Sequence, residues 1–482
     1  GHTTPEVLGA EARILASRGN IEQALDVLRD GLHLHPESGT FLYLDMSRIL
    51  QQAGRMEAIP DLMEEARIRY PDEPDLWQVN IRSLAALERH DEAVTLARQA
   101  ELHFATLGAE PGPPAGSEEP FELEPDLLAE SAPVPGHAQP ESFLVDLADF
   151  YAQRGQPQRA VDILQPLESE GALDLTPSLW LARLLLATGR VEEGAALVDR
   201  ILLEWPSAGR GWFLKAKVSE SIDDWSTAIE YHRRAVELEP YDPEIRLGIL
   251  RAMLLAWERD LRQPEGTPDR DRKMEEFRRH ATVATTTVPD ADVEGQLLMG
   301  YAFRAMGDLE RAAWHFELAA EDPGLRLTAL IQRSICLDEL GQVGRARTVL
   351  ETLRREYPDD PEVANSYGYF LAEKDSDLDL AEGLVKEALA AQPDNGAFLD
   401  SMGWVMYRQG KLESALDYMI QAVNVLPDDP IILEHLGIVF RDLGQISQAR
   451  ETLARALAVG GERDRLEPLI RSLDEELGEA EQ

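Results

Sequence analysis

The chain has 482 residues, which is the length of about three ordinary domains. Asp and Glu total 89 against 47 Lys and Arg, so the formal net charge is −42. A surface this acidic repels phosphate backbones and anionic lipids, which argues against nucleic-acid or membrane-surface binding. No window of the sequence approaches 18 consecutive apolar residues, so we predict no membrane-spanning helix.

Two neighbouring C-terminal segments repeat the same pattern after 34 residues. They read LDSMGWVMYRQGKLESALDYMIQAVNVLP and LEHLGIVFRDLGQISQARETLARALA. Gly403 and Gly437 leave room for a second helix to approach closely, and Ala415 and Ala449 lie where that helix crosses the first. The glycine that follows each first helix can adopt the left-handed conformation that ends it. The pattern predicts pairs of antiparallel helices joined by a short turn.

This pattern resembles the tetratricopeptide repeat, a helix-turn-helix unit of 34 residues. The resemblance implies an all-α solenoid in which helical hairpins stack into a right-handed superhelix. The same register identifies eleven units along the chain. They are 5–38, 40–73, 74–107, 141–174, 175–208, 209–242, 293–326, 327–360, 361–395, 396–429 and 430–463.

Two segments interrupt the register. Residues 108–140 contain eight prolines, seven acids and no Lys or Arg, a composition typical of a disordered linker. Residues 243–292 are interpreted as a divergent repeat with an insertion, in which PEGTPD forms the loop between two helices. We therefore expect an N-terminal stack over 1–107, a linker over 108–140 and a main stack over 141–463. An amphipathic helix and tail over 464–482 cover the last apolar face.

The sequence contains none of the common catalytic or cofactor motifs. HExxH, GxGxxG, a Walker loop and GxSxG are all absent, and the single cysteine, Cys336, is interpreted as a buried structural thiol. His33 and His35 are two residues apart, so they do not share a helix face as metal ligands would. We expect no catalytic residues, no metal and no cofactor, and an enzyme is the least favoured class of function.

Position 9 of each unit is the place to look for partner-binding side chains. In the resembled fold this position faces the concave groove. Position 9 is Arg13, Arg48, Arg82, Asp149, Arg183 and Lys217 in the first six units, then Tyr301, Ile335, Tyr369, Trp404 and Ile438. Position 12 adds Arg304 and Tyr407. The cations would hold carboxylates of a partner, and the apolar residues would anchor an extended or helical segment.

Each row also has a purely structural interpretation. The arginines would then pair with neighbouring Glu residues, and Tyr369 and Trp404 would pack between units. A further hypothesis concerns the acidic segment 118–130, which would compete with a partner for the basic row. Its alternative is that the acids only keep the linker soluble.

The favoured function is a non-enzymatic scaffold or adaptor that binds protein segments, in bacterial complex assembly or substrate delivery. The stretch 358–457, with NSYGYFLAE and FLDSMGWVMYRQGKLESAL, resembles proteobacterial repeat proteins that include outer-membrane lipoproteins. That resemblance implies the alternative, a periplasmic component of an export or protease-adaptor system. The compartment, periplasmic or cytoplasmic, stays open. The residue set with which co-chaperones hold heat-shock protein tails does not occur in three consecutive units.

Overall fold

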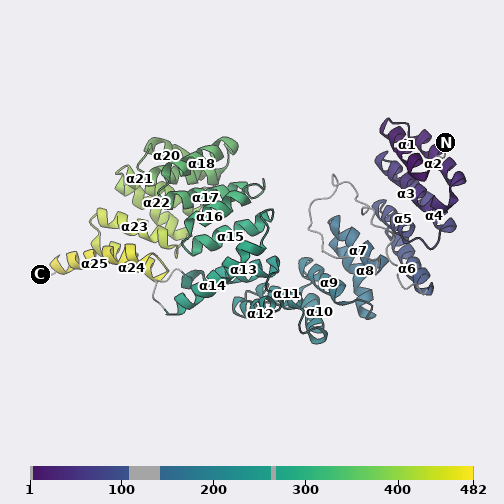
Figure 1. Cartoon of the computed structure of the whole chain (residues 1–482). Coiled ribbons are helices and arrows are strands. Elements are labelled where there is room, and N and C mark those ends of the chain that lie inside the picture. The colour runs from purple at the N-terminus through teal and green to yellow at the C-terminus, as the bar shows by residue number, and fades with distance from the viewer. Residues whose placement is uncertain (1–3, 108–141, 262–267, 481–482) are drawn as a thin grey trace. The chain divides into compact units, whose positions relative to one another are not determined.

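The computed structural model describes residues 4–107, 142–261 and 268–480, and every element in these ranges is a helix (Figure 1). They form 25 α-helices and two short 3₁₀ helices, with no strand in the described ranges. The predicted all-α fold of repeated hairpins is confirmed. The chain divides into two compact units, Gly1–Pro206 and Ser207–Gln482. The segment 108–140, with the proposed contact of 118–130, lies outside the described residues.

The described residues of the first unit form five hairpins, each with a first and a second helix. Its helices are α1 (Pro5–Ser17), α2 (Ile21–Leu34), η1 (Pro36–Ser38), α3 (Gly39–Gln52), η2 (Met56–Ala58), α4 (Ile59–Arg69), α5 (Pro74–Ala86), α6 (His90–Thr106), α7 (Phe143–Gln153), α8 (Pro157–Ser169), α9 (Leu175–Ala187) and α10 (Val191–Glu204).

Within its described residues, the second unit has seven hairpins of the same kind and one final helix. Its helices are α11 (Gly209–Glu220), α12 (Trp225–Leu238), α13 (Pro243–Leu261), α14 (Pro268–Thr287), α15 (Val293–Ala305), α16 (Leu309–Ala319), α17 (Arg326–Glu339), α18 (Val343–Glu356), α19 (Pro361–Glu373), α20 (Leu378–Ala391), α21 (Gly396–Arg408), α22 (Leu412–Val425), α23 (Pro430–Asp442), α24 (Ile446–Ala458) and α25 (Arg463–Ala480).

Small residues bring the two helices of each hairpin into close contact. A Cβ atom placed on Gly403 would lie 2.7 Å from Met419, and one on Gly437 would lie 2.6 Å from Leu453. Ala415 has no exposed surface. Interiors packed at crystal-like density leave no space for an extra methyl group at such positions. The small residues of the pattern therefore fix the distance between the paired helices.

The turn inside each hairpin requires a residue in the left-handed region. The turn glycines from Gly19 to Gly444 have φ between 69° and 82°. In three hairpins that lack this glycine, Glu88, Asp223 and Asp375 adopt the same conformation, with φ of 60°, 58° and 51°. A non-glycine residue there costs about 1–2 kcal/mol. The packing of the two helices therefore sets the turn even where the sequence does not favour it.

Helices α6 and α7 pack directly against each other within the first unit. The rings of Phe104 and Phe143 stack with centroids 5.5 Å apart. Glu101 accepts hydrogen bonds from the Ser142 hydroxyl at 2.5 Å and from the Leu144 amide at 3.2 Å. The sequence divides the chain at 108–140, whereas the compact units divide after Pro206.

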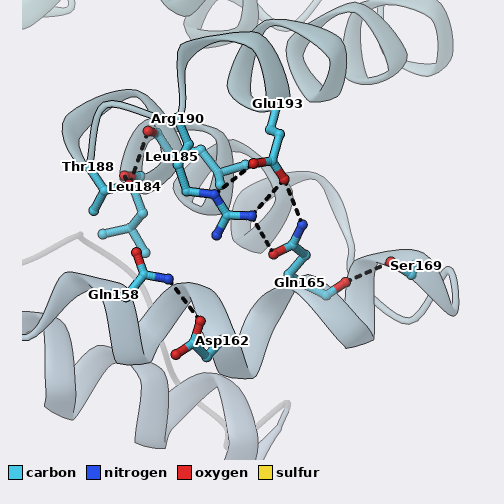
Figure 2. A network of polar contacts seen from close by, with 9 residues as sticks. All are labelled: Gln158, Asp162, Gln165, Ser169, Leu184, Leu185, Thr188, Arg190 and Glu193. Atoms are coloured by element: carbon cyan, nitrogen blue, oxygen red, sulfur yellow. Dashed lines mark hydrogen bonds and ion pairs between the residues drawn. The ribbon is translucent and has the colours of Figure 1, made fainter.

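Polar side chains also connect successive second helices (Figure 2). Arg190, at the start of α10, donates to Glu193 at 2.8 Å and to the Gln165 side-chain oxygen at 3.0 Å. The Gln165 amide, on α8, in turn donates to Glu193 at 3.0 Å. This partly exposed network adds directional hydrogen bonds to the apolar packing between the two hairpins.

The divergent repeat and the C-terminal helix differ slightly from the predicted boundaries. Helix α14 begins at Pro268, inside the predicted loop PEGTPD, because proline is favoured at the first position of a helix. Helix α25 buries Leu466 and Leu473 against the preceding hairpin. In the described ranges, no helix is both long and apolar enough to cross a bilayer.

The close contact inside a hairpin can be tested with a matched pair of substitutions. Gly437→Ala should lower the free energy of unfolding by about 1–3 kcal/mol, because the added methyl group overlaps Leu453. Gly383→Ala, where a Cβ atom meets nothing within 4 Å, should raise it by about 0.5–1 kcal/mol. Urea unfolding followed by circular dichroism measures both. Equal stability of the two variants would contradict the packing described above.

Candidate functional site

The predicted site residues lie on the first helices of successive hairpins, in two separate rows. Throughout, the surface formed by position 9 and its neighbours on these helices is called the first-helix face. In the first unit it carries Arg13, Arg48, Arg82 and Arg183, on α1, α3, α5 and α9. In the second unit it carries Lys217, Tyr301, Arg304, Tyr369, Trp404 and Tyr407, on α11, α15, α19 and α21.

Two predicted cations of the first unit meet at one buried carboxylate. Arg13 Nη1 donates to Asp45 Oδ2 at 2.8 Å, and Arg48 Nη1 donates to Asp45 Oδ1 at 2.9 Å. The Asp45 side chain has 0% exposure, whereas those of Arg13 and Arg48 are 50% and 38% exposed. Gly9 leaves the space for this carboxylate, since a Cβ atom there would lie 2.5 Å from Asp45 Oδ2.

A similar arrangement occurs in the second unit around Glu220. Lys217 Nζ lies 3.1 Å from the Glu220 carboxylate, His232 Nε2 donates to it at 2.7 Å, and Arg251 also contacts it. Burial alone would raise the pKa of Glu220, but the His232 hydrogen bond and the charges of Lys217 and Arg251 lower it to about 2. Burial lowers the pKa values of Lys217 and His232.

The remaining predicted cations lie apart from these two groups. Arg82 is half-buried, and its Nε has no hydrogen-bond partner within the described part of the chain. Arg183 is exposed on α9. Arg304 connects two first helices, because its guanidinium donates to Gln332 at 2.7 Å and lies 3.4 Å from Glu339.

The aromatic residues near the C-terminus gather around His435. Trp404 stacks on the His435 ring with centroids 4.1 Å apart and on Tyr407 at 4.8 Å. Tyr369, from α19, lies 6.2 Å from His435, which belongs to α23. Trp404 is only 7% exposed, so the chain itself covers most of its ring. Tyr301 and Tyr369 stay partly exposed.

Charged groups fix this aromatic cluster from several helices. His435 Nδ1 donates to both oxygens of Asp400, at 3.0 and 2.9 Å. The side chains of Asp400, Glu434 and His435 are all buried. Glu434 forms an ion pair of 2.7 Å with Arg465 of α25. The Tyr407 hydroxyl donates to Asp442 at 2.8 Å. Burial raises the pKa of Tyr369.

Sequence reasoning missed the partners of these residues. Arg251 lies 34 residues after Lys217, so the repeat period would have found it if the divergent unit had been included. Asp45 and Glu220 occupy different repeat positions, 6 and 12, and therefore give no periodic signal. His435 follows Ser401 by 34 residues, but no histidine recurs at that position.

The described residues hold no group of three or more His, Cys, Asp or Glu side chains arranged to bind a metal. Burial raises the pKa of Cys336 to about 11, so its thiol stays protonated at neutral pH. The chemistry that the first-helix face offers is that of recognition: charge-assisted hydrogen bonds, aromatic surface and partly exposed aliphatic side chains.

Comparison with known proteins identifies the repeat. Models described as tetratricopeptide repeat match residues 303–367, residues 179–243 and 401–468, and residues 5–30. A curated relative, the TPR repeat-containing protein PA4667 of Pseudomonas aeruginosa, is 30% identical over 170 residues. That match covers 34% of this chain and 28% of the relative, so it spans less than a third of the relative's length.

Similar chains also occur among solved structures. A TPR protein of Thermus thermophilus is 22% identical, with 38% of this chain and 98% of that chain covered and a TM-score of 0.34. Yeast Tom70 is 12% identical, with 98% and 96% covered and a TM-score of 0.38. The narrower resemblance to outer-membrane lipoproteins stays a prediction.

The buried pair of His435 and Asp400 predicts a pH-dependent stability. Burial alone would lower the pKa of His435, but the charge and hydrogen bond of Asp400 raise it, and Glu373 and Glu434 act in the same direction. A raised folded pKa means that the pair stabilises the fold below the ordinary pKa of histidine, about 6.5. This stabilisation is lost as the pH rises through the folded value.

Thermal melting of the full chain between about pH 5.5 and 9 should show that the stabilisation by this pair falls as the pH rises. This range brackets the ordinary pKa of histidine. The difference in melting temperature between the natural chain and His435→Gln should be largest at low pH and should shrink as pH rises. His232→Gln is the matched control, because the folded pKa of His232 is lowered and its contribution is lost as pH falls. A difference for His435→Gln that is constant across this range would contradict the charged pair.

Proposed function

Since this chain is a tetratricopeptide repeat protein, we propose that it is a non-enzymatic scaffold or adaptor that binds segments of partner proteins on its first-helix face. A fold of this kind supports protein–protein interaction in general. The helices of the repeats and the C-terminal α25 account for the described residues. The proposed site is the surface that the repeats have in common.

One observation carries the proposal, the apolar row of the second unit. Position 9 is aromatic or β-branched in five successive hairpins, at Tyr301, Ile335, Tyr369, Trp404 and Ile438. All except Trp404 are partly exposed, although the chain is strongly acidic. Regularly spaced apolar side chains on adjacent helices fit the anchors of an extended or helical segment.

The polar groups around this row favour binding of a specific partner over non-specific apolar binding. Arg304 with Gln332 and Tyr407 with Asp442 form hydrogen bonds between neighbouring first helices. These polar groups lie beside the apolar positions and have fixed places. A bound segment that forms hydrogen bonds with them would be held in one orientation. The basic row of the first unit supplies cations for acidic parts of a partner.

The finer role that we propose is complex assembly or substrate delivery in a bacterium. The similarity to the Pseudomonas protein supports a bacterial setting, and the sequence of 358–457 supports the envelope alternative, a periplasmic export or protease-adaptor component. The choice between the two roles depends on the partner, whereas the following experiment tests the binding surface that both roles require.

A dodecapeptide display library panned on the immobilised full chain provides a probe. The selected peptide should bind about tenfold more weakly to Tyr301→Ala and Ile335→Ala, because each removes a partly exposed anchor. Trp314→Ala and Ile420→Ala are matched controls, since these exposed side chains belong to the second helices α16 and α22. The controls should keep the affinity of the natural chain.

Melting curves separate binding from folding in this test. Trp404→Ala should lower the melting temperature because the ring is buried and stacked on His435. Tyr301→Ala and Ile335→Ala should melt within a few degrees of the natural chain. Equal affinity of the first-helix variants and the second-helix controls would overturn the proposed site.

A further inference from the structure

A hollow of about 530 Å³ lies between the second helices α6 and α8 of the first unit. Leu144 and Tyr151 of α7, the first helix that follows α6 in the chain, also line it, and both are buried. Asp149, at position 9 of this repeat, is not among the described residues that line the hollow. This hollow, the second-helix groove, is therefore separate from the first-helix face.

Aliphatic side chains form much of the two walls of the groove. Val94 and Leu102 come from α6, and Ile163 and Leu167 come from α8. Leu102 is 69% exposed, and the other three are partly exposed. Concave surfaces with apolar walls are the usual places where a protein buries apolar groups of another molecule. The groove therefore fits a molecule that carries several apolar side chains on one side.

The charged residues that line the groove are mostly acidic. They are Asp91, Glu101, Asp162 and Glu170, against Arg98 and Arg159. Arg159 lies over the Tyr151 ring, 5.8 Å from its centroid. Asp91, at the start of α6, and Glu170, just after α8, are exposed and form no ion pair within the described part of the chain. A Lys or Arg of a partner can therefore reach a carboxylate at either end of the groove, and the net charge of −42 attracts a basic segment.

Pro166 leaves a further acceptor on the wall formed by α8. A proline inside a helix has no N–H, so the carbonyl of Asp162, four residues earlier, loses its usual donor. Both residues line the groove, as expected for positions four apart on one face of a helix. This carbonyl is therefore available to a Lys or Arg donor of a bound molecule.

We propose that the second-helix groove docks an amphipathic helix of a partner protein, with an apolar stripe flanked by Lys or Arg. The proposal goes beyond the proposed function, because it assigns a second binding surface. The residues of α6 that line the groove extend from His90 to Leu102, which is about 18 Å, or about three turns of a bound helix. A helix satisfies its own backbone groups, whereas an extended segment would place unpaired N–H and C=O groups against the apolar walls. The occupant of such a groove is therefore a helix.

The probe is a fluorescein-labelled, amidated peptide of sequence LKKLLKLLKKLLKL, a basic amphipathic helix, and polarisation follows its binding to the full chain. It should bind saturably, whereas LEELLELLEELLEL should not, because the acidic chain repels it. Leu102→Asn should weaken binding about tenfold, since it removes an exposed apolar contact. Ile68→Asn and Leu203→Asn, at exposed positions of α4 and α10, should keep the affinity of the natural chain.

A second pair of variants tests the carboxylates. Asp91→Asn/Glu170→Gln should weaken binding severalfold at low salt, and the loss should shrink as salt screens the charges. Glu192→Gln/Glu204→Gln removes the same charge from the corresponding repeat positions of α10 and should have a much smaller effect. These four side chains are exposed, so the melting curves of both variants should match that of the natural chain.

Several outcomes would contradict the proposal. Equal losses in the two charge variants would show that the peptide responds only to net charge, and unchanged affinity of Leu102→Asn would exclude the apolar wall; either result overturns the groove. Self-association of the natural chain in analytical ultracentrifugation that Leu102→Asn abolishes would assign the groove to a second copy of this chain, against the proposal.

The outcome for the groove is distinguishable from that for the first-helix face. Loss of leucine–lysine peptide binding in Tyr301→Ala, with Leu102→Asn unaffected, would overturn this inference and leave the proposed function standing. Failure of the display-selected peptide to respond to the first-helix variants would overturn the proposed function alone, because the groove does not use that face.

Discussion

The close contact between the two helices of each hairpin is the constraint on which the rest of the structure depends. This contact occupies one face of the first helix. In two of the hairpins, Gly403 and Gly437 lie on that face and meet a side chain of the second helix. A neighbouring hairpin covers another face. The side that remains is therefore the same in every repeat, and position 9 recurs on it at regular spacing. The rows of cations and aromatic residues follow from this geometry, whatever their individual chemistry.

Charged side chains on the first-helix face hold adjacent hairpins together. Asp45 and Glu220 each connect first helices of adjacent hairpins through buried charged contacts. Removing one partner of such a group leaves a buried charge without compensation, which is costly. His435 has a similar connecting role among the aromatic residues. From α23 it contacts two residues of α21, because it donates to Asp400 and stacks on the ring of Trp404.

The sequence predicts the repeating part of this protein well and the exceptions poorly. Period, turn glycines and small residues predict the hairpins, because each reflects a local requirement of two packed helices. The contact between Tyr369 and His435 could not be predicted, since it joins first helices α19 and α23 past the intervening α21. Such contacts depend on how tightly the hairpins stack, and a repeat period does not determine that. The carboxylates that hold the cations could not be predicted from the repeat either, because one occupies position 6 and the other position 12.

The charge of the chain adds selectivity to the proposed binding. With 89 acids against 47 cations, any acidic partner meets an unfavourable field over most of the surface. At physiological ionic strength this field decays over about 8 Å, so it acts strongly only at close approach. Charge-assisted hydrogen bonds, in contrast, act at contact and depend on direction as well as distance. In the proposed binding, the net charge therefore sets how easily a partner approaches, whereas the side chains of the first-helix face decide which segment fits once it is in contact.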